Sequence, residues 1–167
     1  TALFALSEFP QAFRNTLIIS LLSLLFCFPA PIILSLLLNE VNTKWFKKFV
    51  QTGIYLPNFI SWVIIGGLVA SLLSYSTGVV NNVLAGLGVA RVEFVADPKY
   101  FYGILIISQI LRDAGWGTII YIAAITNIDP GLYEAARIDG CKRFKATVHI
   151  TIPCIMPIIV IMFVQAV

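Results

Sequence analysis

Four polar or aromatic side chains interrupt an apolar run in the segment ISQILRDAGWG. They are Gln109, Arg112, Asp113 and Trp116. These positions recur at i, i+3, i+4 and i+7, so a helix of 3.6 residues per turn would place them on one stripe. Amide, guanidinium and carboxylate groups supply hydrogen-bond donors and acceptors, and an indole ring supplies a flat apolar face. The stripe therefore has the chemistry to recognise a polar solute.

The same residue types allow a second interpretation of the stripe. Ionisable groups at membrane depth are costly, and they usually face a bundle interior or a watery cavity, where they mark a pathway. Arg112 could equally form a structural pair with Asp113 or with a neighbouring helix. Asn58 and Trp62, at i and i+4, could add to a pathway lining, although a Trp near the end of a span is more often an interface anchor.

The helices that must hold these side chains follow from composition. Of the 167 residues, 59% are hydrophobic and 11% are charged, and the mean hydropathy is +0.95, too apolar for a soluble domain. Crossing a bilayer takes about 20 mostly apolar residues. Three runs supply them, 16–38, 55–73 and 101–126, and a fourth, 150–167, stops short. We expect an all-α polytopic transmembrane bundle with three full spans and part of a fourth.

The chain starts without a methionine and ends inside the fourth run, so we expect a fragment from the middle of a longer polypeptide. The distribution of Lys and Arg predicts its orientation, because basic connections stay in the cytoplasm. Two connections are basic, through Lys44, Lys47 and Lys48, and through Arg137, Lys142, Arg143 and Lys145. We expect both to be cytoplasmic and residues 74–100 to lie outside. No basic tract is long enough to indicate nucleic-acid binding.

The second basic connection, residues 127–152, carries signals for a helix, a tight turn and another helix. Asp129 suits an N-cap, Pro130 the first helical position and Gly140 a left-handed C-terminal cap. A second helix is expected from about Lys142 into the prolines of the fourth run. Small side chains on the first helix would let another protein approach closely. The alternative is an ordinary amphipathic loop on the membrane surface.

The spacing within this connection resembles the EAA signature of the permease subunits of bacterial ABC importers. The matching residues are Glu134, Ala135, Ala136, Asp139, Gly140, Ile150 and Pro153. Three residues separate Ala136 from Gly140, and nine separate Gly140 from Ile150. Ile152 stands where that pattern usually has Leu, and Cys141 where a small Ala is common. Flanking segments, among them FKKFVQTGIYLPNFISWVI, are similar to carbohydrate-uptake permeases, above all the polysaccharide and complex oligosaccharide branch.

This resemblance implies a type I ABC importer permease with six spans, of which the first and last are missing here. It implies that residues 134–140 form a coupling helix seated on an ABC ATPase dimer, which would itself use ATP and Mg. A second permease subunit, expected to be different, and an extracytoplasmic sugar-binding protein would complete the assembly in the bacterial cytoplasmic membrane. The polar stripe would then line the path of a sugar, whose hydroxyls need donors and acceptors.

Other function classes find less support in the sequence. The phosphate-binding pattern G-x-x-x-x-G-K-[ST] is absent, so we expect no ATP site, and no cofactor, in this chain. His149 is the only histidine, and no nucleophile or metal motif accompanies it, so we expect neither catalysis nor a metal site. An ion-coupled secondary transporter is the alternative kept open, although such a transporter would be built from inverted repeats.

Overall fold

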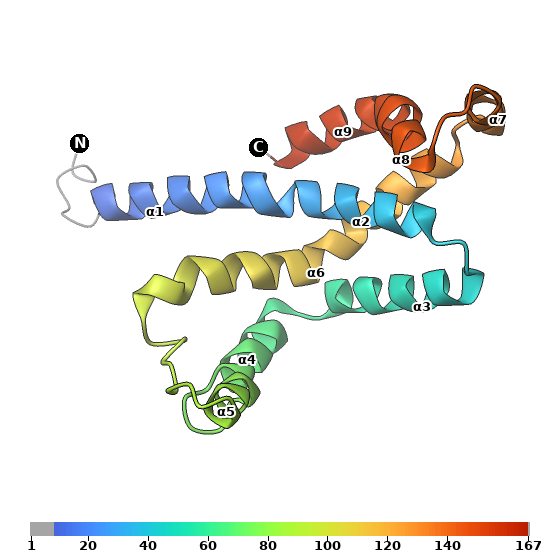
Figure 1. The fold of residues 1–167 in the computed structure, drawn as a ribbon. Helices are drawn as coiled ribbons and strands as arrows, with labels where there is room; N and C mark the ends of the chain where they lie inside the picture. Colours follow the sequence, from blue (N-terminus) through green and yellow to red (C-terminus); the bar gives the residue numbers. More distant parts are fainter. Residues whose placement is uncertain (1–8, 167) are drawn as a thin grey trace.

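The computed structural model describes residues 9–166, and every regular element in that range is helical (Figure 1). The elements are α1 (Phe9–Leu22), the π-helical turn η2 (Ser23–Cys27), α2 (Pro29–Glu40), α3 (Lys44–Tyr55), the 3₁₀ turn η3 (Leu56–Phe59), α4 (Trp62–Leu72), α5 (Val79–Gly86), α6 (Pro98–Thr126), α7 (Pro130–Ile138), α8 (Arg143–Ala146), the π-helical turn η4 (Thr147–Thr151) and α9 (Ile152–Ala166). The all-α prediction is confirmed.

The long helix α6 is the centre of the packing. It contacts α2 most extensively, and it also touches η2, α3, η3 and α9. The close approach depends on glycine: a Cβ on Gly117 would lie 2.8 Å from Cβ of Pro31, and one on Gly115 would collide with the carbonyl oxygen of Ile54. One helical turn beyond Gly117, Tyr121 of α6 joins a buried apolar cluster with Ile155 of α9. Small residues therefore set the helix spacing, as they commonly do in membranes.

Residues 55–73, expected as the second span, do not form one straight helix. The helical segments Lys44–Phe59 and Trp62–Leu72 meet at a bend of 108°. Ile60 at the break is extended, and the Ser61 hydroxyl caps α4 by accepting from the N–H of Ile64. Pro57 lies in η3 just before the break and has no N–H for a helical bond. The lysines expected in a loop are instead on α3, and residues 41–43 make the connection.

Each of the two long apolar helical runs, Phe9–Glu40 and Arg143–Ala166, carries a π-helical turn that ends two residues before a proline. In the first, the N–H of Phe28 bonds to the carbonyl of Ser23 at 3.1 Å, and Pro29 follows. In the last, the N–H of Ile152 bonds to the carbonyl of Thr147, and Pro153 follows. A proline ring clashes with the carbonyl four residues earlier, and widening the preceding turn relieves that clash. The helical irregularity before Pro29 is therefore a π-turn.

The last helical run extends over Arg143–Ala166, 24 residues, because α8 and η4 continue directly into α9. This confirms the second helix expected from about Lys142 into the fourth apolar run. Among the described helices this run and Phe9–Glu40 are long and apolar enough to cross a membrane, and the bent pair could form a third span. Although α6 has 29 residues, polar groups occupy its centre. By length and composition, the described helices thus supply two clear spans, or three when the bent pair is counted as one span.

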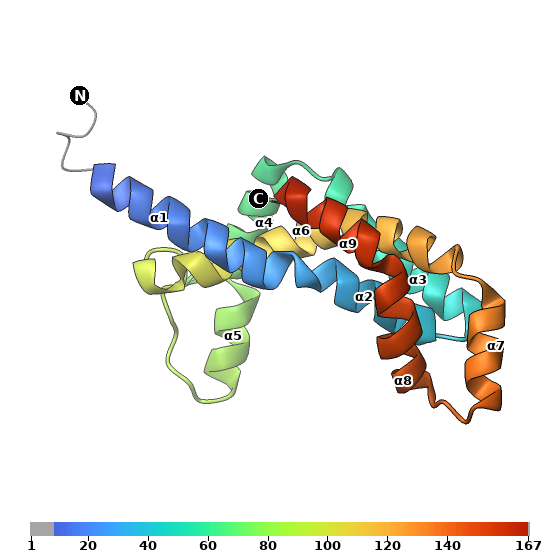
Figure 2. The ribbon, with the colours of Figure 1, turned by 90° about the horizontal axis from the view of Figure 1, so that it is seen from above.

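The connections between spans gather at opposite ends of the molecule (Figures 1 and 2). One end holds α7, α8 and the 41–43 connection, and the other holds α5 within residues 73–97, here called the outer lobe. Fully buried Asn81 ties this lobe together: its Nδ2 donates to Val92 O at 2.9 Å and to Ser74 O at 3.1 Å. The short helix α5 lies within this lobe. This arrangement agrees with the predicted alternation of sides.

Candidate functional site

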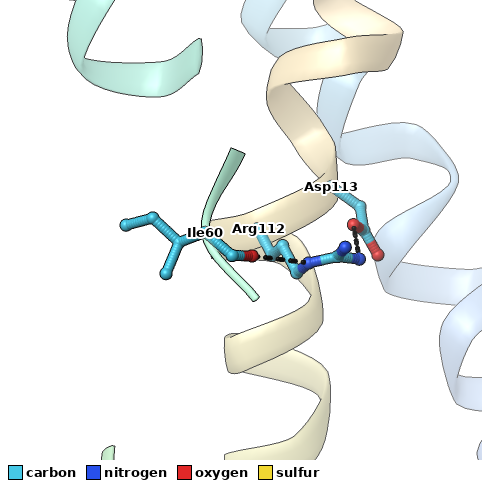
Figure 3. Close-up of polar contacts among 3 residues, drawn as sticks. All are labelled: Ile60, Arg112 and Asp113. Carbon is cyan, nitrogen blue, oxygen red and sulfur yellow. Dashed lines mark hydrogen bonds and ion pairs between the residues drawn. The ribbon is translucent and has the colours of Figure 1, made fainter. Parts of the chain in front are cut away.

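At the centre of α6, Arg112 reaches out of its own helix to the bend between α3 and α4. Its Nη1 lies 2.9 Å from Oδ1 of Asp113, and its Nε donates to the carbonyl oxygen of Ile60 at 3.4 Å (Figure 3). The guanidinium also covers the ring of Trp62, with Cζ 4.9 Å from the centroid. Because Ile60 is extended, its carbonyl is free to accept. Arg112 thus pairs with the Asp113 carboxylate and bonds to the backbone at the break between α3 and α4.

The other three predicted side chains of this stripe line a cavity of about 220 Å³ between α6, η2 and α9. Gln109 accepts a hydrogen bond of 2.9 Å from the hydroxyl of Ser23. Asp113 takes part in the ion pair with Arg112 and also lines the cavity. Trp116 is 57% exposed. The structure therefore contains both the ion pair and the polar lining that the sequence left as alternatives.

The two residues proposed from the second span do not share a helix face. Asn58 lies in η3 and Trp62 begins α4, and the bend at Ile60 falls between them. The i, i+4 argument is therefore wrong for this pair, because it assumed one continuous helix. Trp62 stacks on Arg112 and also lines an apolar cavity between α4 and α6.

Two further residues of the α6 cavity were missed from the sequence. The Tyr121 hydroxyl is buried and has no hydrogen-bond partner among residues 9–166, and its side chain lines the cavity. Leu24 also lines it, and its carbonyl loses its usual helical partner because Phe28 N–H bonds to Ser23 and residue 29 is proline. Pro29 is the signal in the sequence that could have indicated the unpartnered carbonyl of Leu24. Tyr121 lies in an apolar run, and no pattern in the sequence distinguishes it.

At the opposite end from the outer lobe, α7 has the caps predicted from its sequence. Asp129 Oδ1 accepts from the N–H of Gly131 at 2.9 Å at its start. At its end Gly140 has φ of +73°, and the N–H of Cys141 bonds to the carbonyl of Ala136 at 2.8 Å. With the bond from Gly140 N–H to Arg137 O, this is a Schellman motif. The left-handed cap is confirmed.

The remaining residues of the EAA-like pattern occupy three different places. Glu134, Ala135 and Asp139 are exposed on or next to α7, and Ala136 is half-buried. Ile150 is half-buried in η4, and Pro153 lies in the first turn of α9. Apolar Ile138 is 87% exposed at the end of α7. The projecting helix thus offers a carboxylate, small side chains and an apolar side chain on one accessible element.

Comparisons with known proteins assign this arrangement to a family. The family described as binding-protein-dependent transport system inner membrane component matches residues 9–167. A polygalacturonan/rhamnogalacturonan transport system permease protein, YteP of Bacillus subtilis, is 45% identical over 162 residues, covering 97% of this chain and 50% of that protein. Protein LplB of the same organism is 40% identical over 157 residues, covering 94% of this chain and 49% of that protein.

A solved structure agrees in both fold and sequence. A bacterial ABC transporter involved in the import of the acidic polysaccharide alginate contains a chain with a TM-score of 0.96 and 50% identity, covering 99% of this chain and 58% of that one. This chain spans about half the length of the curated relatives it matches. The match extends over the spans, the polar centre and the projecting helix, so the chain belongs to the family of binding-protein-dependent transport system inner membrane components.

Proposed function

We propose that the chain is the central part of a membrane permease subunit that passes a carbohydrate, derived from an oligo- or polysaccharide, through the cytoplasmic membrane by alternating access. A separate ABC ATPase dimer would supply the energy, and a second permease subunit and an extracytoplasmic sugar-binding protein would complete the assembly. Family membership and the polysaccharide-related names of two relatives support this proposal. Membership of this family also argues against an ion-coupled secondary transporter.

The observation that carries the proposal is the projecting helix α7. A capped helix of 9 residues with exposed Glu134 and Leu132 is suited to insertion into a groove on another protein. The proposed coupling segment, residues 127–152, contains α7 and the first turns of the span that begins at Arg143. Closure of two ATPase subunits on ATP would displace α7, and the attached span would move as a rigid body.

The cavity on α6 is the proposed passage for the sugar. The Gln109 amide can donate hydrogen bonds to hydroxyl groups and accept bonds from them, and the Asp113 carboxylate can accept them. The exposed face of Trp116 can stack on the apolar face of a sugar ring. Arg112 and Trp62 take a different part in the proposal: they hold the α3–α4 bend that borders the passage. Asn58 is half-buried next to this bend and is proposed as a contributor to the border.

The first test is capture of the ATPase by the full-length permease. Glu134→Lys should weaken capture, because it reverses the charge on the proposed docking helix while leaving the caps intact. Glu93→Lys is the matched control: it makes the same change at an exposed position in the outer lobe. Equal capture by the wild type and Glu134→Lys would contradict the docking role of α7. If correctly inserted wild type captured no ATPase, the importer proposal would fail and an ion-coupled transporter would be reconsidered.

A further inference from the structure

The projecting helix α7 is only loosely attached to the rest of the described chain. It packs closely on no other helix, and a cavity of about 190 Å³ separates it from α8 and the end of α2. Glu40, Arg137 and Arg143 are among the residues around this cavity, and no ion pair joins them. The orientation of α7 therefore depends on the chain at its two ends and on whatever polar contact crosses the gap.

Within residues 9–166, one side-chain hydrogen bond joins α7 to another helical element. The hydroxyls of Tyr133 and Thr151 lie 2.8 Å apart. Thr151 is only 1% exposed and Tyr133 is half-buried, so water competes poorly for the bond. A second contact braces the same π-turn from the first span: the hydroxyl of Thr147 lies 3.1 Å from Oε1 of Glu40, although it also faces the carbonyl of Arg143 at 3.1 Å.

The position of Thr151 connects this bond to the interior of the bundle. Thr151 is the last residue of η4, the π-turn that precedes Pro153. One helical turn further on, Ile155 is 1% exposed and packs in the cluster that contains Tyr121. Tyr121 in turn lines the α6 cavity. The Tyr133–Thr151 bond, the continuous helix that carries Thr151 and Ile155, and the cluster of Ile155 with Tyr121 therefore connect α7 to the proposed passage.

We propose that the hydrogen bond between Tyr133 and Thr151 is the positioning contact that fixes the angle of α7 against the last described span. This inference rests on the proposed function. With the bond in place, a displacement of α7 is passed to η4 and α9; without it, the turn at Gly140 absorbs part of the displacement. Tyr133 and Thr151 act through the helices that they join, and neither is assigned to the sugar or to ATP.

The test uses the full-length permease assembled with its ATPase, its second permease subunit and its sugar-binding protein in proteoliposomes. Tyr133→Phe keeps the aromatic ring and removes the hydroxyl. A hydrogen bond of this kind changes an equilibrium by roughly two- to tenfold, so we expect the ATP hydrolysed per sugar imported to rise within that range while assembly is unchanged. Thr151→Val should have the same effect, Thr151→Ser should retain coupling, and the double variant should add little to either single one.

The matched control is Tyr102→Phe. It also removes a tyrosine hydroxyl bonded to another helix, in this case to Oδ1 of Asn15 at 2.9 Å, but at the end of the molecule away from α7. We expect the control to keep the wild-type ratio of ATP to sugar. An unchanged ratio in Tyr133→Phe would overturn the inference, while intact ATPase capture in the same samples would leave the proposed function standing. If the wild type captured no ATPase, both would fall together.

Discussion

Substitution of Gly140 tests the role of the left-handed turn behind α7. The φ of +73° lies in a region that an L-residue with a Cβ enters only at a cost. A Cβ built on Gly140 meets no atom within 4 Å, so the cost arises from the backbone and not from crowding. We therefore expect the variants to rank by their tolerance of this conformation: Gly140→Asn mildest, Gly140→Ala intermediate and Gly140→Val most severe.

The size of the effect follows from the same geometry. A left-handed conformation costs a non-glycine residue about 1–2 kcal/mol, which corresponds to roughly five- to thirtyfold in the population that keeps the native turn. Asn pays less, because its short polar side chain is tolerated in this region. Sugar import per ATP should fall by up to that factor in Gly140→Val, because α7 would spend most of its time at a different angle from the span that follows.

The assay is sugar uptake and ATP hydrolysis measured in the same proteoliposomes. Gly88→Val is the matched control, because Gly88 has φ of +77°, meets no atom within 4 Å at its Cβ position and lies in the outer lobe. It carries the same backbone penalty away from α7, so its ratio of sugar to ATP should stay near the wild-type value. Wild-type coupling in Gly140→Val, with normal expression, would refute the reasoning, as would an equal loss in Gly88→Val.

Three other substitutions probe the packing, the outer lobe and the polar centre. Gly115→Ala should lower the thermal unfolding midpoint in detergent, because its methyl group meets the α3 backbone and such overpacking costs about 1–3 kcal/mol. Asn81→Ala should make the outer lobe more sensitive to protease, since the lost hydrogen bonds to Val92 and Ser74 contribute about 1 kcal/mol each. Arg112→Ala or Trp116→Ala should reduce sugar uptake and leave ATPase capture intact.

Each of these predictions has an outcome that contradicts it. An unfolding midpoint of Gly115→Ala at or above the wild-type value would mean that α3 and α6 can separate without cost. Protease resistance equal to the wild type in Asn81→Ala would show that the lobe is held by other contacts. Loss of ATPase capture in Arg112→Ala would assign the Arg112–Asp113 pair a purely structural role and remove it from the passage.

The helix α7 and its turn could be predicted because their signals are local. An N-cap at Asp129, a proline at the first helical position and a glycine at the left-handed cap act through hydrogen bonds within a few residues, so spacing alone identifies them. The bend near Ile60 could not be predicted in the same way. Pro57 permits either the first turn of a helix or a bend, and the choice depends on α6, whose Arg112 occupies the carbonyl exposed by the break.

By itself, the sequence determined the helical class, the membrane setting, the alternation of basic and non-basic connections and the capped helix that projects from one end. Composition and short-range hydrogen bonding decide these features without knowledge of any distant contact. Only the tertiary structure decided which way each polar side chain of α6 turns, that Tyr121 faces the cavity, and that Tyr133 meets Thr151. These depend on how closely α6 packs on its neighbours and on π-turns before prolines, which bring together residues far apart in the chain.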